Sequence, residues 1–161
     1  MIEKLFTIGV YEKTEDEFFG QLIENNIDTF CDIRRRRGLR GAKYSFVNSI
    51  RLQERLNNLG INYVHLLHLS PSVEVRNIQK EIDKQSRMLK RERTGLSKEF
   101  IDAFIQMNLQ NYNLDDFYSY TGESASRVVL FCVENDFNAC HRSLVADFII
   151  NNTKEISLIH L

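Results

Sequence analysis

The chain has 161 residues, of which 43% are hydrophobic and 27% charged, and this length predicts one domain, residues 1–161, that folds without disulfides or a structural metal. Its net charge of −1 excludes a protein that binds polyanions through overall charge, so an electrostatic site has to come from a local cluster. The sequence has no apolar run near the ~18 residues of a membrane span, so no membrane-spanning helix is expected.

The first half of the chain alternates short apolar runs with amphipathic segments. The apolar runs predict strands over residues 5–9, 28–33 and 61–67. Helical spacing of apolar side chains predicts one helix after Thr14 and another over residues 48–59. Thr14 and Glu17 have the spacing of a capping box, and Gly60 is placed for the left-handed turn that ends the second helix.

The second half begins with a predicted helical insert over residues 72–121. The insert is highly charged from Val73 to about residue 93, and richer in aromatic residues from Ser97 to about residue 120. After the insert, the pattern predicts a strand over residues 127–133, a helix over 139–151 and a strand over 156–160. This order of elements predicts an α/β fold, a Rossmann-like three-layer sandwich whose mostly parallel sheet of about five strands has helices on both faces.

The most reactive side chains lie where the fourth predicted strand passes into a helix. The strand ends at Cys132 to Glu134, and the helix begins around Cys140 to Arg142. Ligands of α/β proteins bind at the carboxyl edge of the sheet, so these side chains mark a candidate site. With Asn138 as the N-cap, Cys140 would lie in the first helical turn, where the helix dipole and Arg142 favour a thiolate.

These residue types suit nucleophilic catalysis, with Cys140 as the nucleophile and Glu134 and His141 as acid/base groups. A zinc site built from both cysteines and His141 is a weaker alternative, because adjacent helical residues diverge by about 100°. We therefore predict no metal and no other cofactor. The structural alternatives are a Cys132 that packs in the core and an ion pair between Glu134 and Arg142.

A basic loop over residues 34–45 leaves the same edge of the predicted sheet. It contains no acidic residue and these basic ones: Arg34, Arg35, Arg36, Arg37, Arg40 and Lys43. Such a loop suits the phosphate of a nucleotide or a nucleic-acid backbone, and the alternative is a solvated charge cluster. Arg34 stands apart, because it shares a side of the strand with Asp32, its expected local partner.

Further side chains are expected near this edge. His65 ends the third predicted strand, and is either an acid/base group or a hydrogen-bonded structural histidine. Tyr11 follows the first strand and is expected to stack on a ring or to position a phosphate. The basic segment from Arg87 to Lys98 is either a second phosphate-contacting surface or a solvated helix end.

Several of these motifs together resemble the bacterial and archaeal family called Domain of Unknown Function 488. The motifs that carry the resemblance are Thr7-Ile8-Gly9, residues 28–34, residues 60–65, residues 131–134 and Cys140-His141-Arg142. The resemblance covers nearly the whole chain and implies the same fold and site, but no settled activity. The chain departs from the common pattern at Val10, where many members have His, and in the basic loop, which usually carries Pro.

From these observations we expect a protein of the cytoplasm, because three irregularly spaced cysteines fit a reducing compartment. The first interpretation is an enzyme that acts on a phosphorylated or nucleotide-like substrate. The residues expected to contact the anion are Arg34, Arg142, Asp32, Tyr11, Arg35, Arg37 and His65. The alternatives are a non-catalytic nucleic-acid-binding or DNA-repair-associated module and a non-catalytic interaction domain. No membrane partner is expected, and the sequence does not predict an oligomeric state.

Overall fold

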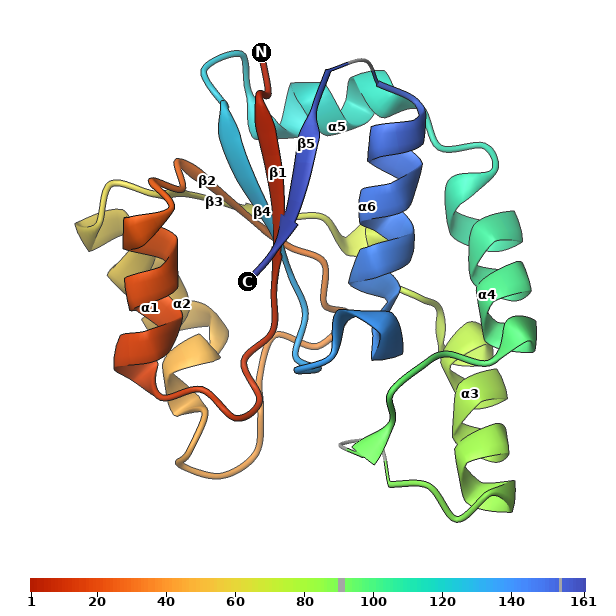
Figure 1. Ribbon diagram of the computed structural model, residues 1–161. Helices are drawn as coiled ribbons and strands as arrows, with labels where there is room; N and C mark the ends of the chain where they lie inside the picture. Colours follow the sequence, from red (N-terminus) through yellow and green to blue (C-terminus); the bar gives the residue numbers. More distant parts are fainter. Residues whose placement is uncertain (90–91, 154) are drawn as a thin grey trace.

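A computed structural model describes residues 1–89, 92–153 and 155–161 (Figure 1). At its centre is a sheet of five strands in the order β3-β2-β4-β1-β5. The strands are β1 (Lys4–Ile8), β2 (Thr29–Asp32), β3 (Asn62–His65), β4 (Arg127–Phe131) and β5 (Ser157–His160). Every pairing is parallel, which confirms the predicted α/β fold and brings the carboxyl ends of all five strands to one edge.

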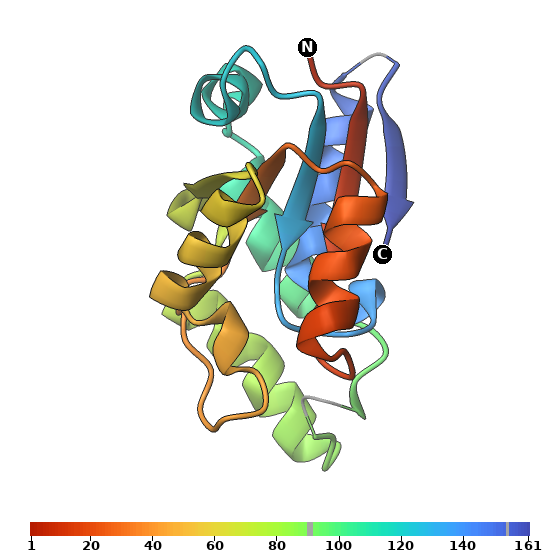
Figure 2. The same cartoon turned by 90° about the vertical axis from the view of Figure 1, so that its left-hand side faces the viewer.

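Helices cover both faces of the sheet (Figures 1 and 2). On one face lie α1 (Glu15–Glu24) and α2 (Ser49–Asn58). The other face carries α6 (His141–Asn151) and, outside it, α3 (Val73–Gln85) and α4 (Lys98–Phe104) of the helical insert. The insert ends with α5 (Leu114–Thr121). None of the helices in the described part of the chain has the length and apolar character needed to cross a bilayer.

Local signals start and end the first helices as predicted. The Glu17 amide donates to Thr14 Oγ1 at 3.2 Å, and the Thr14 amide donates to Glu17 Oε2 at 2.7 Å, so the capping box is complete. After α2, Gly60 has a φ of +72°, a left-handed conformation that glycine adopts without strain.

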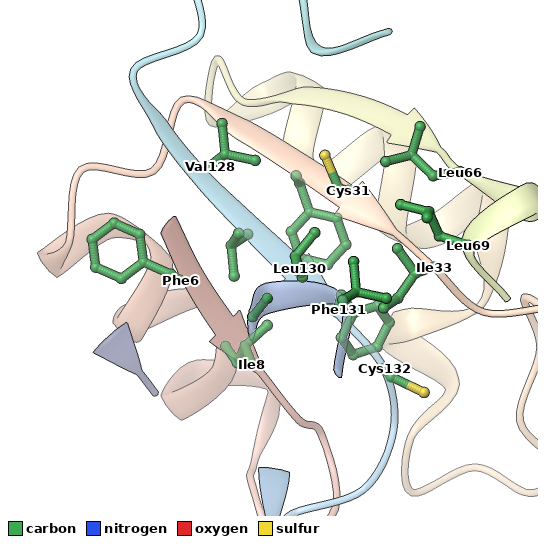
Figure 3. Packing of buried hydrophobic residues seen from close by; sticks show 14 of the residues in the cluster. Phe6, Ile8, Cys31, Ile33, Leu66, Leu69, Val128, Leu130, Phe131 and Cys132 are labelled. Atoms are coloured by element: carbon green, nitrogen blue, oxygen red, sulfur yellow. The ribbon is translucent and has the colours of Figure 1, made fainter. Parts of the chain in front are cut away.

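The central strands are buried on both faces, as expected for a parallel sheet that lies between helices. Beyond its first residue, β4 is fully buried, whereas the edge strand β5 is partly exposed throughout. Phenylalanines fill the space between the sheet and α1, where Phe18 packs edge-on against Phe30 and Phe131. Figure 3 shows part of this core, including Cys31, which is buried in β2.

The insert predicted over residues 72–121 is helical and consists of several elements. Its first helix, α3, ends at Gln85, where the Ser86 hydroxyl donates to the Ile82 carbonyl and Arg87 turns to a φ of +54°. The aromatic half contains α4, a π-helical segment over Ile105–Leu109, and α5. Two residues of the basic segment from Arg87 to Lys98, Lys90 and Arg91, lie outside the described residues.

The carboxyl ends of β1 and β4 approach each other closely at Gly9. The amides of Val10 and Tyr11 both donate to the Val133 carbonyl, at 3.2 and 3.1 Å. A Cβ atom on Gly9 would lie 1.9 Å from the Glu134 carbonyl oxygen, which is far inside van der Waals contact. Only glycine therefore allows the chain after β4 to take this path.

We predict that Gly9→Ala destabilises the protein by about 1–3 kcal/mol, because the methyl group would displace the backbone at Glu134. Gly20→Ala is the matched control: it lies within α1, its Cβ would meet nothing within 4 Å, and it should stabilise by about 0.5–1 kcal/mol. Urea unfolding measures both changes. Equal stability of Gly9→Ala and the unchanged protein would contradict the close approach.

Candidate functional site

The chain between β4 and α6 forms the site and follows a different path from the predicted one. Asp136, not Asn138, provides the local cap: its side chain accepts from the Asn138 amide at 2.8 Å and starts a short 3-10 turn. The helix α6 then begins at His141, with Cys140 as its N-cap in an extended conformation (φ −137°, ψ 141°). The prediction that Cys140 lies within the first helical turn was therefore wrong.

This extended residue brings two cysteines and a histidine together. The Sγ atoms of Cys132 and Cys140 and the Nδ1 atom of His141 all lie within 4.8 Å of one another. His141 Nδ1 is 3.9 Å from each sulfur. The expected helical divergence between Cys140 and His141 does not apply, because Cys140 has no helical backbone angles. The three side chains thus form one buried cluster.

The orientation of the His141 ring is fixed by a backbone group. Its Nε2 atom lies 3.0 Å from the Ile33 carbonyl oxygen. A carbonyl oxygen only accepts, so Nε2 carries a proton, and Nδ1 is the ring nitrogen that faces the sulfurs. Phe104 of α4 packs edge-on against the ring at a centroid distance of 5.5 Å. The histidine is therefore held in one tautomer and one position.

The two thiols of the cluster have opposite pKa shifts. Burial acts to raise the pKa of Cys140, but a hydrogen bond from the Cys132 thiol and the charge and backbone amide of Arg142 together lower it to about 7. The pKa of Cys132 is raised, because its thiol donates to Cys140 and is itself buried. Cys140 is therefore the cysteine of the pair that ionises first, with thiol and thiolate both present near neutral pH.

Arg142 holds the chain that leads to this cluster. Its side chain is 1% exposed, and it donates from Nη1 to the Glu134 carbonyl at 2.5 Å and from Nη2 to the Asn135 carbonyl at 2.9 Å. The sequence suggested an ion pair between Glu134 and Arg142. The structure shows a hydrogen bond from Arg142 to the backbone carbonyl of Glu134. These bonds give Arg142 a structural task in addition to its effect on Cys140.

Arg93 is a residue of the site that the sequence did not single out. Its guanidinium lies 2.8 Å from Asp83 of α3 and 3.8 Å from the Glu134 carboxylate, and it donates to the Ala139 carbonyl at 3.0 Å. Arg93 thereby ties the helical insert to the loop before α6. It appeared in the sequence only as one member of a basic segment, and no local pattern connected it with residues more than 40 positions later.

Asp32 and Arg34 form a second buried unit. Arg34 donates from Nε and Nη2 to the two oxygens of Asp32, at 2.9 and 2.7 Å, and from Nη2 to the Val47 carbonyl at 2.9 Å. The Tyr63 hydroxyl also donates to Asp32, and burial together with this carboxylate raises the pKa of Tyr63 to about 12. Arg34 Nη1 is buried and has no hydrogen-bond partner within the described residues.

This second unit lies on the opposite face of the sheet from the cysteines. The Arg34 guanidinium lies 4.5 Å from the centre of the Phe131 ring, which packs against α1. Cys132 follows Phe131, and its side chain points to the other face, where it meets His141. The structure therefore divides the predicted site into a cysteine–histidine cluster on the α6 side and an Asp32–Arg34 unit on the α1 side.

The remaining predicted residues lie around these units. His65 Nε2 donates to the Arg34 carbonyl at 2.9 Å, and the Tyr11 ring packs at 5.3 Å against that of Tyr44. Arg35 donates to the Pro71 carbonyl at 2.8 Å. The loop is anchored to the start of α2 by backbone and side-chain bonds, and its exposed basic residues are Arg35, Arg36, Arg40 and Lys43.

We predict that Asp32→Asn destabilises the protein by about 3–5 kcal/mol, because it leaves the buried Arg34 charge without its counter-ion. The matched control is Arg51→Gln, which breaks an exposed ion pair with Glu15 and should change stability little. Urea unfolding of both variants at neutral pH makes the comparison. Similar, small effects of the two substitutions would show that the buried pair is not needed for stability.

A comparison with known proteins identifies a family for this chain. The sequence model of a family described as Domain of unknown function DUF488 matches residues 14–149. The matched stretch runs from the cap of α1 into α6 and contains both the cysteine–histidine cluster and the Asp32–Arg34 unit. No curated protein and no solved structure matches the chain. Because the match covers most of the chain and confirms the predicted resemblance, the protein belongs to the DUF488 family.

Proposed function

We propose that the protein is an enzyme that uses the Cys140 thiolate to attack a phosphorylated or nucleotide-like substrate at the carboxyl edge of the sheet. The observation that carries this proposal is the position of Cys140: its sulfur lies at the start of α6, beside the Cys132 thiol and the Nδ1 atom of His141. A thiolate in such surroundings is a nucleophile at neutral pH.

Each neighbour has a task in this proposal. Cys132 donates a hydrogen bond to the Cys140 sulfur, which stabilises the thiolate before attack. His141 Nδ1 would accept the proton of the Cys140 thiol. As the Cys140 sulfur bonds to the phosphorus of the substrate and the bond to the leaving group breaks, the ring would give that proton to the leaving group, while the Ile33 carbonyl accepts the hydrogen bond of Nε2. Glu134, the second acid/base candidate, lies at the strand end with its carboxylate near Arg93.

The basic loop supports an anionic substrate. It leaves the carboxyl end of β2, the edge at which Cys132 follows β4, and carries four exposed cationic side chains (Arg35, Arg36, Arg40 and Lys43). Charges at the rim of a site raise the local concentration of an anion and speed its arrival. The buried Arg34 and Arg142 are engaged with protein oxygens, so the exposed members of the loop are the first contacts of the substrate.

The first test is the pH dependence of iodoacetamide reaction, resolved to Cys140 by mass spectrometry in the presence of a chelator. The thiolate is the reacting form, so the rate should rise as the pH increases through about 7. Cys132→Ala removes a hydrogen-bond donor to the thiolate and should move the midpoint to higher pH, whereas Cys31→Ser, which changes a buried cysteine outside the cluster, should not.

Phosphate or a nucleotide should slow the reaction of Cys140 if it binds beside the sulfur. A midpoint at or above the ordinary thiol value of ~8.5 would rule out Cys140 as the nucleophile. Protection without a shifted midpoint would support an anion site and contradict the catalytic role.

The exposed basic loop also favours a second candidate function, binding of nucleic acid without catalysis. We predict that labelled single- or double-stranded DNA binds at low salt, and that Arg36→Gln, Arg40→Gln and Lys43→Gln together weaken binding. Each lost phosphate contact should reduce the slope of log affinity against log salt by about 0.7–0.9. Fluorescence anisotropy measures this slope.

Two controls separate this function from the enzyme. Lys98→Gln removes an exposed cation on α4, away from the loop, and should leave DNA binding unchanged. Cys140→Ser should likewise have no effect on binding. Absence of binding at low salt, or equal losses for Lys98→Gln and the loop variant, would exclude the loop as a nucleic-acid surface.

A further inference from the structure

We infer that Cys132, Cys140 and His141 form a binding site for a thiophilic divalent cation, with Zn²⁺ as the best fit, and that the cation controls the thiolate of the proposed enzyme. The metal site itself stands on the geometry of the three side chains. Only its regulatory consequence rests on the proposed function, because a metal-bound sulfur no longer attacks a substrate.

The donor set is the first argument. Two cysteine sulfurs and one imidazole nitrogen are ligands that Zn²⁺ binds in preference to the oxygen-seeking Mg²⁺ and Ca²⁺. The three donor atoms belong to residues from two elements, the end of β4 and the start of α6, yet they lie within 4.8 Å of one another. Among the described cysteine, histidine, aspartate and glutamate side chains, this is the one group whose ligand atoms lie close enough together to hold a metal ion.

The distances are close to those of a bound metal. Zinc bonds of ~2.3 Å to sulfur and ~2.05 Å to nitrogen, at tetrahedral angles, place sulfur and nitrogen ligands about 3.6 Å apart. In the structure, His141 Nδ1 is 3.9 Å from the sulfur of Cys132 and 3.9 Å from that of Cys140. A contraction of a few tenths of an ångström therefore brings each sulfur–nitrogen pair to this spacing, and the two sulfurs, which lie within 4.8 Å of each other, would close to about 3.8 Å.

The histidine is already oriented as a metal ligand. Metal-binding histidines usually donate their second ring N–H to a carbonyl or carboxylate, which fixes the tautomer and the ring plane. His141 makes this contact to Ile33 through Nε2 and leaves the Nδ1 lone pair toward the sulfurs. Within the described part of the chain, the contacts given for His141 Nδ1 are those with the two cysteine sulfurs.

The backbone around the cluster is held in place by side chains that do not bind the metal. Arg142 bonds the carbonyls of Glu134 and Asn135, and Arg93 bonds the carbonyl of Ala139, the residue before Cys140. Three protein ligands leave a fourth position for water or another small ligand.

The test uses the full chain, reduced and treated with a chelator that is then removed, and titrated with Co²⁺. We expect one Co²⁺ per chain, with thiolate-to-cobalt charge-transfer absorption and the visible bands of a tetrahedral ion, both abolished when Zn²⁺ is added. Cys132→Ser, Cys140→Ser and His141→Gln should each weaken binding by more than the ~10–100-fold that loss of a supporting group causes.

Matched controls keep the ligand variants interpretable. Cys31→Ser and His65→Gln change a cysteine and a histidine outside the cluster and should bind Co²⁺ as the unchanged protein does. Circular dichroism reports whether each variant folds. If a ligand variant does not fold, the unchanged protein still decides: Zn²⁺ should protect both Cys132 and Cys140 from iodoacetamide, and Mg²⁺ should not.

The outcomes separate the metal site from the enzyme. Thiolate–cobalt absorption in a protein whose metal-free Cys140 reacts like an ordinary thiol would support the metal site and remove the nucleophile. A reactive Cys140 with no such absorption and no protection by Zn²⁺ would overturn the metal site and leave the proposed enzyme standing. Absorption that persists in Cys132→Ser and His141→Gln would also overturn it, because the metal would then be bound elsewhere.

Discussion

The buried guanidinium of Arg142 is the interaction on which the carboxyl edge of this protein depends. A cation removed from water is unfavourable by several kcal/mol unless polar groups surround it. Here two carbonyl oxygens, those of Glu134 and Asn135, accept its hydrogen bonds. These bonds fix the chain after β4 in a path so close to β1 that only glycine fits at position 9. The same charge lowers the pKa of Cys140, so one residue sets both the shape of the loop and the ionisation of its thiol.

The parts of this arrangement that follow local rules could be predicted from the sequence. The apolar runs gave the parallel strands, Thr14 and Glu17 gave the start of α1, and the Cys-Glu and Cys-His-Arg segment marked the correct edge of the sheet. The parts that depend on distant contacts could not. Asp136 diverts the chain into a 3-10 turn, which makes Cys140 an extended N-cap, and only a folded chain shows that its sulfur then meets Cys132. Likewise, nothing near Arg93 in the sequence predicts that it reaches the loop before α6.

The separation of the two buried units by the sheet changes how the charged motifs are interpreted. Asp32 and Arg34 satisfy each other, and Arg34 also bonds the Val47 carbonyl, so this pair joins the end of β2 to the segment that leads into α2. The Asp32–Arg34 pair therefore holds the basic loop in place and does not belong to the cysteine–histidine cluster. The exposed arginines beyond it project from a rigid base. Their charge is therefore independent of the thiol chemistry, which allows substitutions in the loop to change anion binding without moving the Cys140 sulfur.

At the cluster itself, the proposed attack on a substrate and the proposed metal binding would compete for the same electron pairs. The sulfur of Cys140 uses one lone pair either as a nucleophile or as a ligand, and the Nδ1 atom of His141 either accepts a proton or binds a cation. Burial affects the two uses differently. Cys140 is 2% exposed, and two hollows of the surface beside Lys13, one toward Ala42 and one toward Gly20, are not lined by any member of the cluster. An ion is small enough to enter a buried cluster, whereas a nucleotide-sized substrate of the proposed enzyme would need the chain around Cys140 to move. In this chain the carbonyls of Glu134, Asn135 and Ala139 accept bonds from Arg142 and Arg93, so these bonds oppose the movement that the proposed attack requires, and the proposed metal site requires no such movement.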